Sequence, residues 1–139
     1  MKRNVPISTI MSSDLFSVHT GQPLSEVRRL LAERPLHHVP VVSGKKLVGL
    51  ISATDMLRLS FQAYGTDERT VDAVLDNQFS ISKVMTTKLV TLNRKRTIRD
   101  AAELLREGTF HSLPIVDDDD NLVGIVTSTD LIRYHLDQY

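Results

Sequence analysis

The sequence GLISATDMLRL (Gly49–Leu59) returns almost unchanged as GIVTSTDLIRY (Gly124–Tyr134), about half a chain further on. Each copy has an apolar run typical of a buried strand, a Ser/Thr-x-x-Asp step and then an amphipathic helical pattern. One strand-to-helix phrase is therefore written twice in a chain of 139 residues.

The repetition extends well beyond these eleven-residue phrases. ISTIMSSDLFSV (Ile7–Val18) matches ISKVMTTKLVTL (Ile81–Leu92), and LSEVRRLLAERPLHHVPVV (Leu24–Val42) matches IRDAAELLREGTFHSLPIV (Ile98–Val116). With two copies only, the pattern predicts an internally duplicated domain rather than an open solenoid. The expected boundaries are one unit at 1–63, a polar linker at 64–79 and a second unit at 80–139.

The composition is that of a compact globular protein. It is 41% hydrophobic, and Lys plus Arg equal Asp plus Glu at 17 each, so no global field attracts nucleic acid or an acidic membrane. The absence of Cys excludes disulfides, thiolate metal sites and a thiol nucleophile. No apolar stretch has membrane-spanning length and the first residues lack an apolar leader, so we expect a cytoplasmic protein without a membrane partner.

Each copy predicts the element order β-α-β-β-α, a mixed α/β (α+β) class. Extended pieces are expected at 15–18 and 89–92, and the closing helices are expected to begin near Met56 and Leu131. Two short β-rich runs precede each closing helix, and a helical turn or two is expected in the linker. The expected apolar stripes of the first helices are Leu24, Val27, Leu30 and Leu31 in one copy, and Ile98, Ala101, Ala102, Leu104 and Leu105 in the other.

These motifs together resemble the CBS domain. The resemblance rests on three motifs that occur in the same order in both copies. They are a Met-Ser/Thr motif at the start, an apolar-Pro-apolar-Val strand and a Gly-x-x-Ser/Thr-x-x-Asp motif at the end. Two such units in tandem resemble the CBS pair, or Bateman module, over almost the whole chain. The resemblance implies two units packed sheet to sheet about a pseudo-two-fold axis, with two related clefts. It also implies that the protein is a regulatory module that senses an adenosine nucleotide, and that it is not an enzyme. No cofactor is expected.

The Ser/Thr-x-x-Asp step has two interpretations. It is a helix N-cap, in which a hydroxyl accepts from the backbone three residues on. The same helix start, with its positive dipole end, also favours phosphate. In the family resembled here, the Asp holds ribose hydroxyls, which assigns that role to Asp55 and Asp130. The hydroxyls assigned to the phosphate by the same resemblance are Ser52, Thr54, Thr127 and Thr129.

His37 and His111 occupy equivalent positions, three residues before a proline, and Arg58 and Arg133 each follow the Asp by three residues. We weigh surface positions against contacts to a ligand phosphate for all four, because an imidazole or a guanidinium can donate to phosphate oxygens. The adenine pocket is the least defined part, and its candidates could equally be plain core. These candidates are Leu15, Phe16, Val39, Leu89, Val90 and Leu113.

Two features separate the copies. Arg34-Pro35 stands where the second copy has Gly108-Thr109, and Pro35 is expected to force Arg34 out of helical angles, whereas Gly108 suits a helix end. Asp117–Asp120 occupies the turn between two strands, where a solvated turn is favoured over a Ca²⁺ or Mg²⁺ site because no Gly-assisted loop is present. No Ser-His-Asp order, P-loop or dinucleotide fingerprint appears, so catalysis is not expected.

Three ligand hypotheses remain open at this point. The favoured one is an adenosine ligand, AMP or ATP first, with ADP, S-adenosylmethionine or a dinucleotide as others. The alternatives are a ligand-free structural or protein-interaction module, and a sensor of divalent metal that uses His37 and His111. Apolar residues on several sides of the closing helices further predict a homodimer and an unknown regulated partner. These residues are Met56, Leu57, Leu59, Phe61, Leu131, Ile132, Tyr134 and Leu136.

Overall fold

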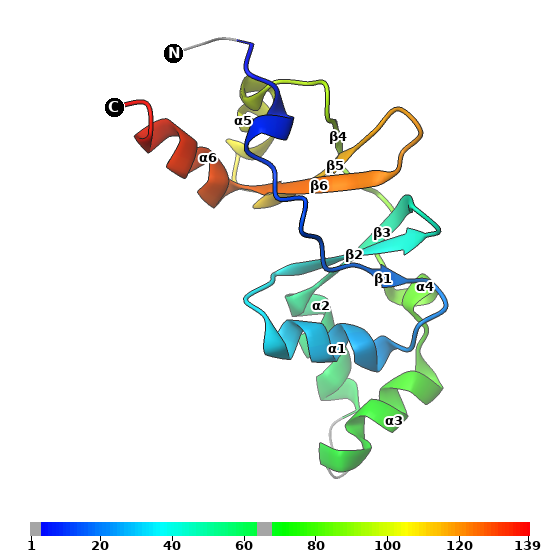
Figure 1. The fold of residues 1–139 in the computed structure, drawn as a ribbon. Helices are drawn as coiled ribbons and strands as arrows, with labels where there is room; N and C mark the ends of the chain where they lie inside the picture. The colour runs from blue at the N-terminus through cyan, green and yellow to red at the C-terminus, as the bar shows by residue number, and fades with distance from the viewer. Residues whose placement is uncertain (1–3, 64–67) are drawn as a thin grey trace. The chain divides into compact units, whose positions relative to one another are not determined.

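The computed structural model of the chain describes residues 4–63 and 68–139 (Figure 1). Contacts divide the chain into two compact units, which are described here one at a time. The first-repeat unit is Phe16–Leu89, and the second-repeat unit joins Met1–Leu15 to Val90–Tyr139.

The first-repeat unit is a three-stranded sheet in the order β1-β2-β3, with helices packed against it. β1 pairs in parallel with β2, and β2 pairs in antiparallel fashion with β3. Both α1 and α2 lie on the same side of this sheet (Figure 1). The elements are β1 (Val18–His19), α1 (Leu24–Glu33), β2 (His38–Ser43), β3 (Lys46–Ser52), α2 (Ala53–Gln62), α3 (Glu68–Gln78) and α4 (Ile81–Val84).

The second-repeat unit has the same topology, with the sheet order β4-β5-β6 and the same parallel and antiparallel pairings. Its elements are the 3₁₀ helix η1 (Ile7–Thr9), β4 (Leu92–Asn93), α5 (Ile98–Leu105), β5 (Ser112–Val116), β6 (Leu122–Thr127) and α6 (Ser128–Leu136). The predicted order β-α-β-β-α is therefore confirmed in both units, and so is the mixed α/β class.

Several predicted boundaries are wrong by about one helical turn. The closing helices begin at Ala53 and Ser128, three residues before the predicted starts, because a hydroxyl on the preceding residue already caps the first turn. The first strands begin only at Val18 and Leu92, where pairing with the next strand starts. Their predicted openings at 15–18 and 89–92 thus lie mostly outside the sheets.

The first helices follow most of their predicted stripes, although Leu31 and Ala102 are only half-buried. Leu24, Val27 and Leu30 are buried in α1, and Ile98, Ala101 and Leu105 are buried in α5. Leu104 is 37% exposed and lies off the stripe, because one position before Leu105 falls on another face of the helix. A capping box of Thr97 and Asp100 is present at the start of α5, whereas α1 begins after Pro23 without a side-chain cap.

The segments that open each repeat pack into the unit that contains the other repeat. Ile7 is buried in the core of the second-repeat unit, and Ile81 is buried in the core of the first-repeat unit. Ser12 exchanges two backbone hydrogen bonds with Ile125, at 2.8 and 3.0 Å, and Thr86 does the same with Leu50. The predicted boundaries at 1–63 and 80–139 follow the sequence repeat, whereas the contacts divide the chain elsewhere.

The glycine that opens each repeated phrase lies under a methionine of the exchanged segment. A Cβ on Gly49 would overlap the side chain of Met85, and a Cβ on Gly124 would overlap that of Met11. Interiors are packed too closely to absorb such an overlap without movement. The repeated Gly and the repeated Met-Ser/Thr opening are therefore two halves of one contact.

The predicted linker contains a full helix that belongs to the first-repeat unit. In α3, Asp72 accepts from Nη1 of Arg28 at 2.8 Å. Asp76 accepts from the backbone N–H of Ser25 at 2.8 Å and from its hydroxyl at 2.7 Å. The remainder of the predicted linker, residues 64–67, lies outside the described residues. Within the described part of the chain, no helix is long and apolar enough to cross a membrane.

Candidate functional site

The start of α2 brings together several residues of the first predicted site. Ser52 is the N-cap, and its hydroxyl accepts from the backbone N–H of Asp55 at 3.0 Å. The half-buried carboxylate of Asp55 accepts from Nη2 of Arg58 at 3.1 Å. The contacts described for this helix start include no return bond from Asp55 to the N-cap backbone. This carboxylate is therefore held by an exposed side chain rather than by the backbone.

The start of α6 has the same sequence pattern but a closed capping box. The hydroxyl of Thr127 accepts from the N–H of Asp130 at 3.2 Å, and Oδ2 of Asp130 accepts from the N–H of Thr127 at 2.9 Å. In the described residues, Arg133 forms no ion pair with Asp130. Both interpretations of the Ser/Thr-x-x-Asp step are compatible with these geometries, because the caps are real and the carboxylates stay partly exposed.

Each predicted histidine lies beside the helix start of its own repeat. The carbonyl of His37 accepts from the N–H of Ala53 at 2.8 Å, and that of His111 accepts from the N–H of Ser128 at 2.9 Å. The register of β2 on β3 and of β5 on β6 brings each histidine to the helix start, because the residue after the histidine pairs with the N-cap residue. Both side chains are exposed. Within each unit, the histidine and the Asp of one repeat therefore flank one helix start.

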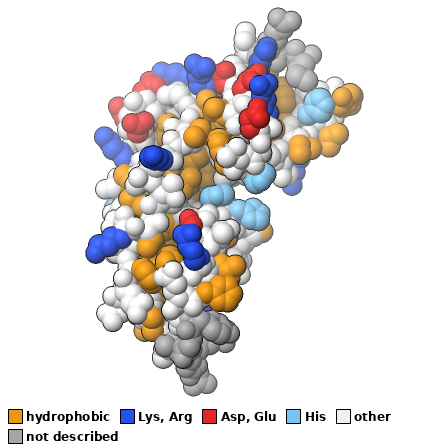
Figure 2. Space-filling model, turned by 180° about the vertical axis from the view of Figure 1, so that it is seen from behind, with side chains coloured by type: hydrophobic (Ala, Val, Ile, Leu, Met, Phe, Trp, Pro, Cys, Tyr) orange, Lys and Arg blue, Asp and Glu red, His pale blue; other side chains and the backbone are white. Residues whose placement is uncertain are grey.

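Thr54 and Arg58 lie on an exposed side of α2. They line a shallow hollow along this helix together with Leu57, Phe61 and Gln62. Thr129 and Arg133 are likewise exposed on α6. Acidic and basic side chains are interspersed over the face seen in Figure 2, in agreement with the neutral composition. Phosphate binding would therefore depend on local donors rather than on a broad positive surface.

The candidates for the adenine pocket divide into two groups. Val39 and Leu113 are 0% exposed and belong to the two cores, so they offer no surface to a ligand as the structure stands. Leu15, Phe16 and Leu89 are half-buried, and Val90 is 44% exposed. One face of the Phe16 ring is covered by the guanidinium of Arg34, whose Cζ lies 3.9 Å from the ring centroid. All six assignments stay predictions.

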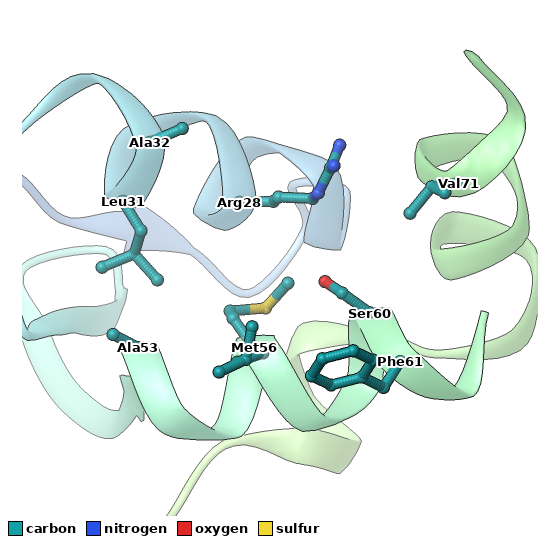
Figure 3. A pocket seen from close by; sticks show the side chains of 9 residues that line it. Arg28, Leu31, Ala32, Ala53, Met56, Ser60, Phe61 and Val71 are labelled. Carbon is teal, nitrogen blue, oxygen red and sulfur yellow. The ribbon is translucent and has the colours of Figure 1, made fainter. Parts of the chain in front are cut away.

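A groove of about 460 Å³ lies among α1, α2 and α3 in the first-repeat unit (Figure 3). None of the predicted site residues lines it. Its lining is Arg28, Leu31, Ala32, Ala53, Met56, Leu57, Ser60, Phe61 and Val71. It is lined by Val71 of α3 and by Ala53, the first residue of α2, so it adjoins the start of α2 without including the predicted site residues.

The four aspartates form the turn between β5 and β6. Asp117 accepts from the N–H groups of Asn121 and Asp119, each at 2.9 Å, and these bonds help to hold the pKa of Asp117 below its usual range, with Asn121 as the main cause. Asp118 accepts from Nζ of Lys95 at 2.6 Å, which likewise lowers the pKa of Asp118. Protein groups thus bind the carboxylates of Asp117 and Asp118. Among the described residues, no group of three or more His, Cys, Asp or Glu could hold a metal ion.

Comparison with known proteins matches both repeats to one family. The model of the CBS domain matches residues 7–61 and again 81–137. The CBS domain-containing protein YhcV of Bacillus subtilis is 30% identical over 125 residues, which cover 90% of this chain and 81% of YhcV. The inosine-5'-monophosphate dehydrogenase of Thermoplasma acidophilum is also 30% identical, over 95% of this chain but only 24% of the enzyme. Across several other curated relatives, the chain spans 23% to 47% of their length.

Solved structures agree with this match over nearly the full chain. CBSX2 in complex with AMP has a TM-score of 0.79 and 25% identity, and the similarity covers 96% of this chain and 98% of CBSX2; CBSX2 is a CBS-pair protein from Arabidopsis thaliana. The CBS domain pair of protein MJ0100, in complex with 5'-methylthioadenosine and S-adenosyl-L-methionine, has a TM-score of 0.73 and 25% identity over 94% of this chain and 99% of that chain. The chain belongs to the CBS domain family and is a tandem CBS pair.

Proposed function

We propose that this CBS pair binds an adenosine-containing nucleotide at the starts of α2 and α6 and reports it to a protein partner. The observation that carries the proposal is the duplicated helix start, where a hydroxyl cap and a partly exposed carboxylate lie beside a histidine whose backbone carbonyl bonds the first residue of the helix. The ligand class is supported by CBSX2, which was solved with AMP, and by MJ0100, which was solved with two adenosine compounds. AMP, ADP and ATP are the first candidates, followed by S-adenosylmethionine.

The roles follow from the chemistry of each group. Asp55 and Asp130 accept from the two ribose hydroxyls, since a carboxylate has acceptors enough for both. The phosphate lies at the positive end of the helix, where Ser52 or Thr127 and the following threonines add hydroxyl donors. His37 and His111 donate from the imidazole ring to the phosphate. Arg58 would leave Asp55 and donate to a phosphate oxygen instead.

Regulation rather than catalysis is part of the same proposal. Relatives with enzyme names are matched over about a quarter of their length, 23% for one and 24% for another, so their activities reside largely in sequence that this chain does not match. The chain supplies a ligand-dependent contact surface instead.

That contact surface includes the outer sides of α2 and α6. Leu57 and Phe61 are 59% and 62% exposed, and the equivalent Ile132 and Leu136 are 59% and 61% exposed. Large apolar side chains exposed at the same positions of both repeats favour a protein interface. We propose a homodimer through these helices, and light scattering at micromolar concentrations checks it: a monomeric mass throughout excludes the dimer.

Binding of AMP, ADP and ATP to Asp55→Ala/Asp130→Ala tests the nucleotide site, by calorimetry. We expect binding to be abolished while the free energy of unfolding falls by about 1 kcal/mol or less per cap. Asp100→Ala is the matched control, because Asp100 closes an equivalent capping box at α5, away from the proposed site. A double variant that binds all three nucleotides as wild type does would reject the ribose assignment. Loss of binding in Asp100→Ala as well would indicate a general effect of capping.

A further inference from the structure

The guanidinium of Arg34, at the end of α1, lies over the aromatic ring of Phe16, with its Cζ 3.9 Å from the ring centroid. The side chain is exposed, and in the described part of the chain it forms no ion pair with a carboxylate. Two other exposed arginines of this unit are paired, Arg29 with Glu26 and Glu33, and Arg58 with Asp55. Arg34 therefore carries a full positive charge whose anionic partner is not in the described chain.

The backbone of Arg34 is fixed by its neighbours. Pro35 excludes helical angles at the residue before it, and Arg34 is extended, with φ −133° and ψ 149°. Its N–H donates to the carbonyl of Leu30 at 3.1 Å, and its own carbonyl accepts from Leu36 at 2.8 Å. Both backbone groups of Arg34 are bonded and its guanidinium contacts the Phe16 ring, which limits where the side chain can go before any ligand arrives.

Stacking leaves the hydrogen-bonding capacity of Arg34 intact. A guanidinium stacks through its face, whereas its five N–H donors lie in the plane and point outward. Two of these donors match two oxygens of a phosphate, which is the geometry of a bidentate contact. The contact with Phe16 thus leaves donors of Arg34 available to an anion, and the covered face of the ring is unavailable for stacking on adenine.

The position of Arg34 relates it to the start of α2. His37 follows by three residues and bonds Ala53, the first residue of α2, through its carbonyl. A chain extends by at most about 3.5 Å per residue, so the Cα atoms of Arg34 and His37 lie within roughly 10 Å. An arginine side chain close to the proposed phosphate position can therefore meet phosphates further along a nucleotide.

The second repeat lacks both halves of this arrangement. Gly108 stands in place of Arg34, with φ 72°, and Val90 stands in place of Phe16. The second-repeat site therefore has no guanidinium and no aromatic ring at these positions.

We propose that Arg34 is a specificity-determining residue that directs nucleotides with two or three phosphates to the first-repeat site. The second-repeat site takes the monophosphate or an uncharged adenosine compound with less discrimination. This inference rests on the proposed nucleotide function, and it assigns different nucleotides to the two helix starts.

Single-site backgrounds test the division. Asp130→Ala retains the first-repeat site and Asp55→Ala retains the second, and calorimetry gives the affinities of ATP and AMP for each. In Asp130→Ala, Arg34→Gln should lower the ratio of ATP to AMP affinity about tenfold, the size of one charge-assisted contact. Phe16→Leu should lower it by less, since the charge stays but loses its support. Arg29→Gln, on the same helix, should leave the ratio unchanged.

Arg34→Gln in the Asp55→Ala background should have no effect on the ratio of ATP to AMP affinity. An ATP to AMP ratio that Arg34→Gln leaves unchanged in Asp130→Ala would overturn the inference. So would an equal fall in both backgrounds, because it would place Arg34 at no particular site.

Inorganic tripolyphosphate supplies a test that does not depend on adenosine recognition. The Nε–H resonance of Arg34 in wild-type protein should shift saturably on titration with tripolyphosphate, and this response should weaken in Phe16→Leu. If nucleotides fail to bind but this shift occurs, the proposed function is wrong and Arg34 remains an anion-binding residue. If nucleotides bind and Arg34 does not respond to tripolyphosphate, the inference alone is wrong.

Discussion

The starts of α2 and α6 share one sequence pattern and differ in what holds the Asp. Asp130 accepts from the backbone N–H of Thr127 at 2.9 Å, whereas Asp55 accepts from the exposed guanidinium of Arg58 at 3.1 Å. An exposed ion pair contributes about 0–1 kcal/mol and is easily exchanged. Releasing a capping-box oxygen leaves a backbone N–H without its partner, which costs more. The comparison teaches that the first-repeat carboxylate is the one more readily turned to a ligand.

The largest expected effect comes from removing each carboxylate alone. Asp55→Ala and Asp130→Ala should each abolish one binding event and leave the other, so that the calorimetric stoichiometry falls from two to one. The event lost in Asp55→Ala should be the tighter one. Two sites of equal affinity in the wild type would show that the two helix starts are equivalent. Loss of both binding events from one substitution would show that the sites are coupled.

Adding a methyl group at the glycine that contacts a methionine should lower the free energy of unfolding in both units alike. Gly49→Ala and Gly124→Ala each place a methyl group on a methionine side chain, and overpacking of this kind costs about 1–3 kcal/mol of unfolding free energy. Urea unfolding measures the loss, and a second substitution, Met85→Ala or Met11→Ala respectively, should recover part of it. Gly21→Ala is the control, because nothing lies within 4 Å of an added Cβ there. A loss no larger than that of Gly21→Ala would show that the contact is loose.

Proton binding by the two histidines should tighten nucleotide binding as pH falls from about 8 to about 6. A protonated imidazole adds positive charge beside the phosphate, so the anionic ligand favours the protonated form. The gain should flatten near pH 6, where phosphate itself takes up a proton. Titrations of AMP into wild type, His37→Gln and His111→Gln separate the two sites. A pH profile that neither substitution changes would show that neither histidine contacts the phosphate.

The smallest effect concerns the first helices, of which only α5 begins with a side-chain cap. The backbone N–H and hydroxyl of Thr97, followed by Arg96, lower the pKa of Asp100. A depressed folded-state pKa adds stability that is complete above the unfolded-state value, and that stability is lost as pH falls through the folded-state value. Wild type should therefore lose slightly more stability than Asp100→Asn in acid unfolding between about pH 5 and pH 2. Parallel curves would show that the box contributes nothing.

Local pattern determined a large part of the fold from sequence. The capping box of Thr97 with Asp100, the extended angles of Arg34 before Pro35 and the positive φ of Gly108 all depend on residues a few positions apart. The repeat itself predicted the element order and both Ser/Thr-x-x-Asp helix starts. Apolar periodicity puts the starts of the closing helices one turn late, because the capping residue precedes the first apolar position of each helix.

The candidate site was predicted in its residue types but not in its contacts. Sequence comparison between the copies placed each histidine and each Asp in equivalent positions, and strand pairing brings them to one helix start within each unit. In the sequence, Arg34 stands out only as a difference between the two copies beside a proline. Its pairing with Phe16 joins residues far apart in the chain, and the position of Phe16 beside it has no local signal.

What sequence alone determined is therefore the set of elements, their caps and the duplication, because these depend on periodicity and on hydrogen bonds within three or four residues. Only the tertiary structure decided which segment completes which core, where Ile7 joins the second-repeat unit and Ile81 the first. It also decided that Val39 is core, that α3 packs on α1 and that Asp55 and Asp130 are held differently. These outcomes depend on contacts between residues distant in the chain, for which apolar patterns specify burial but not the partner.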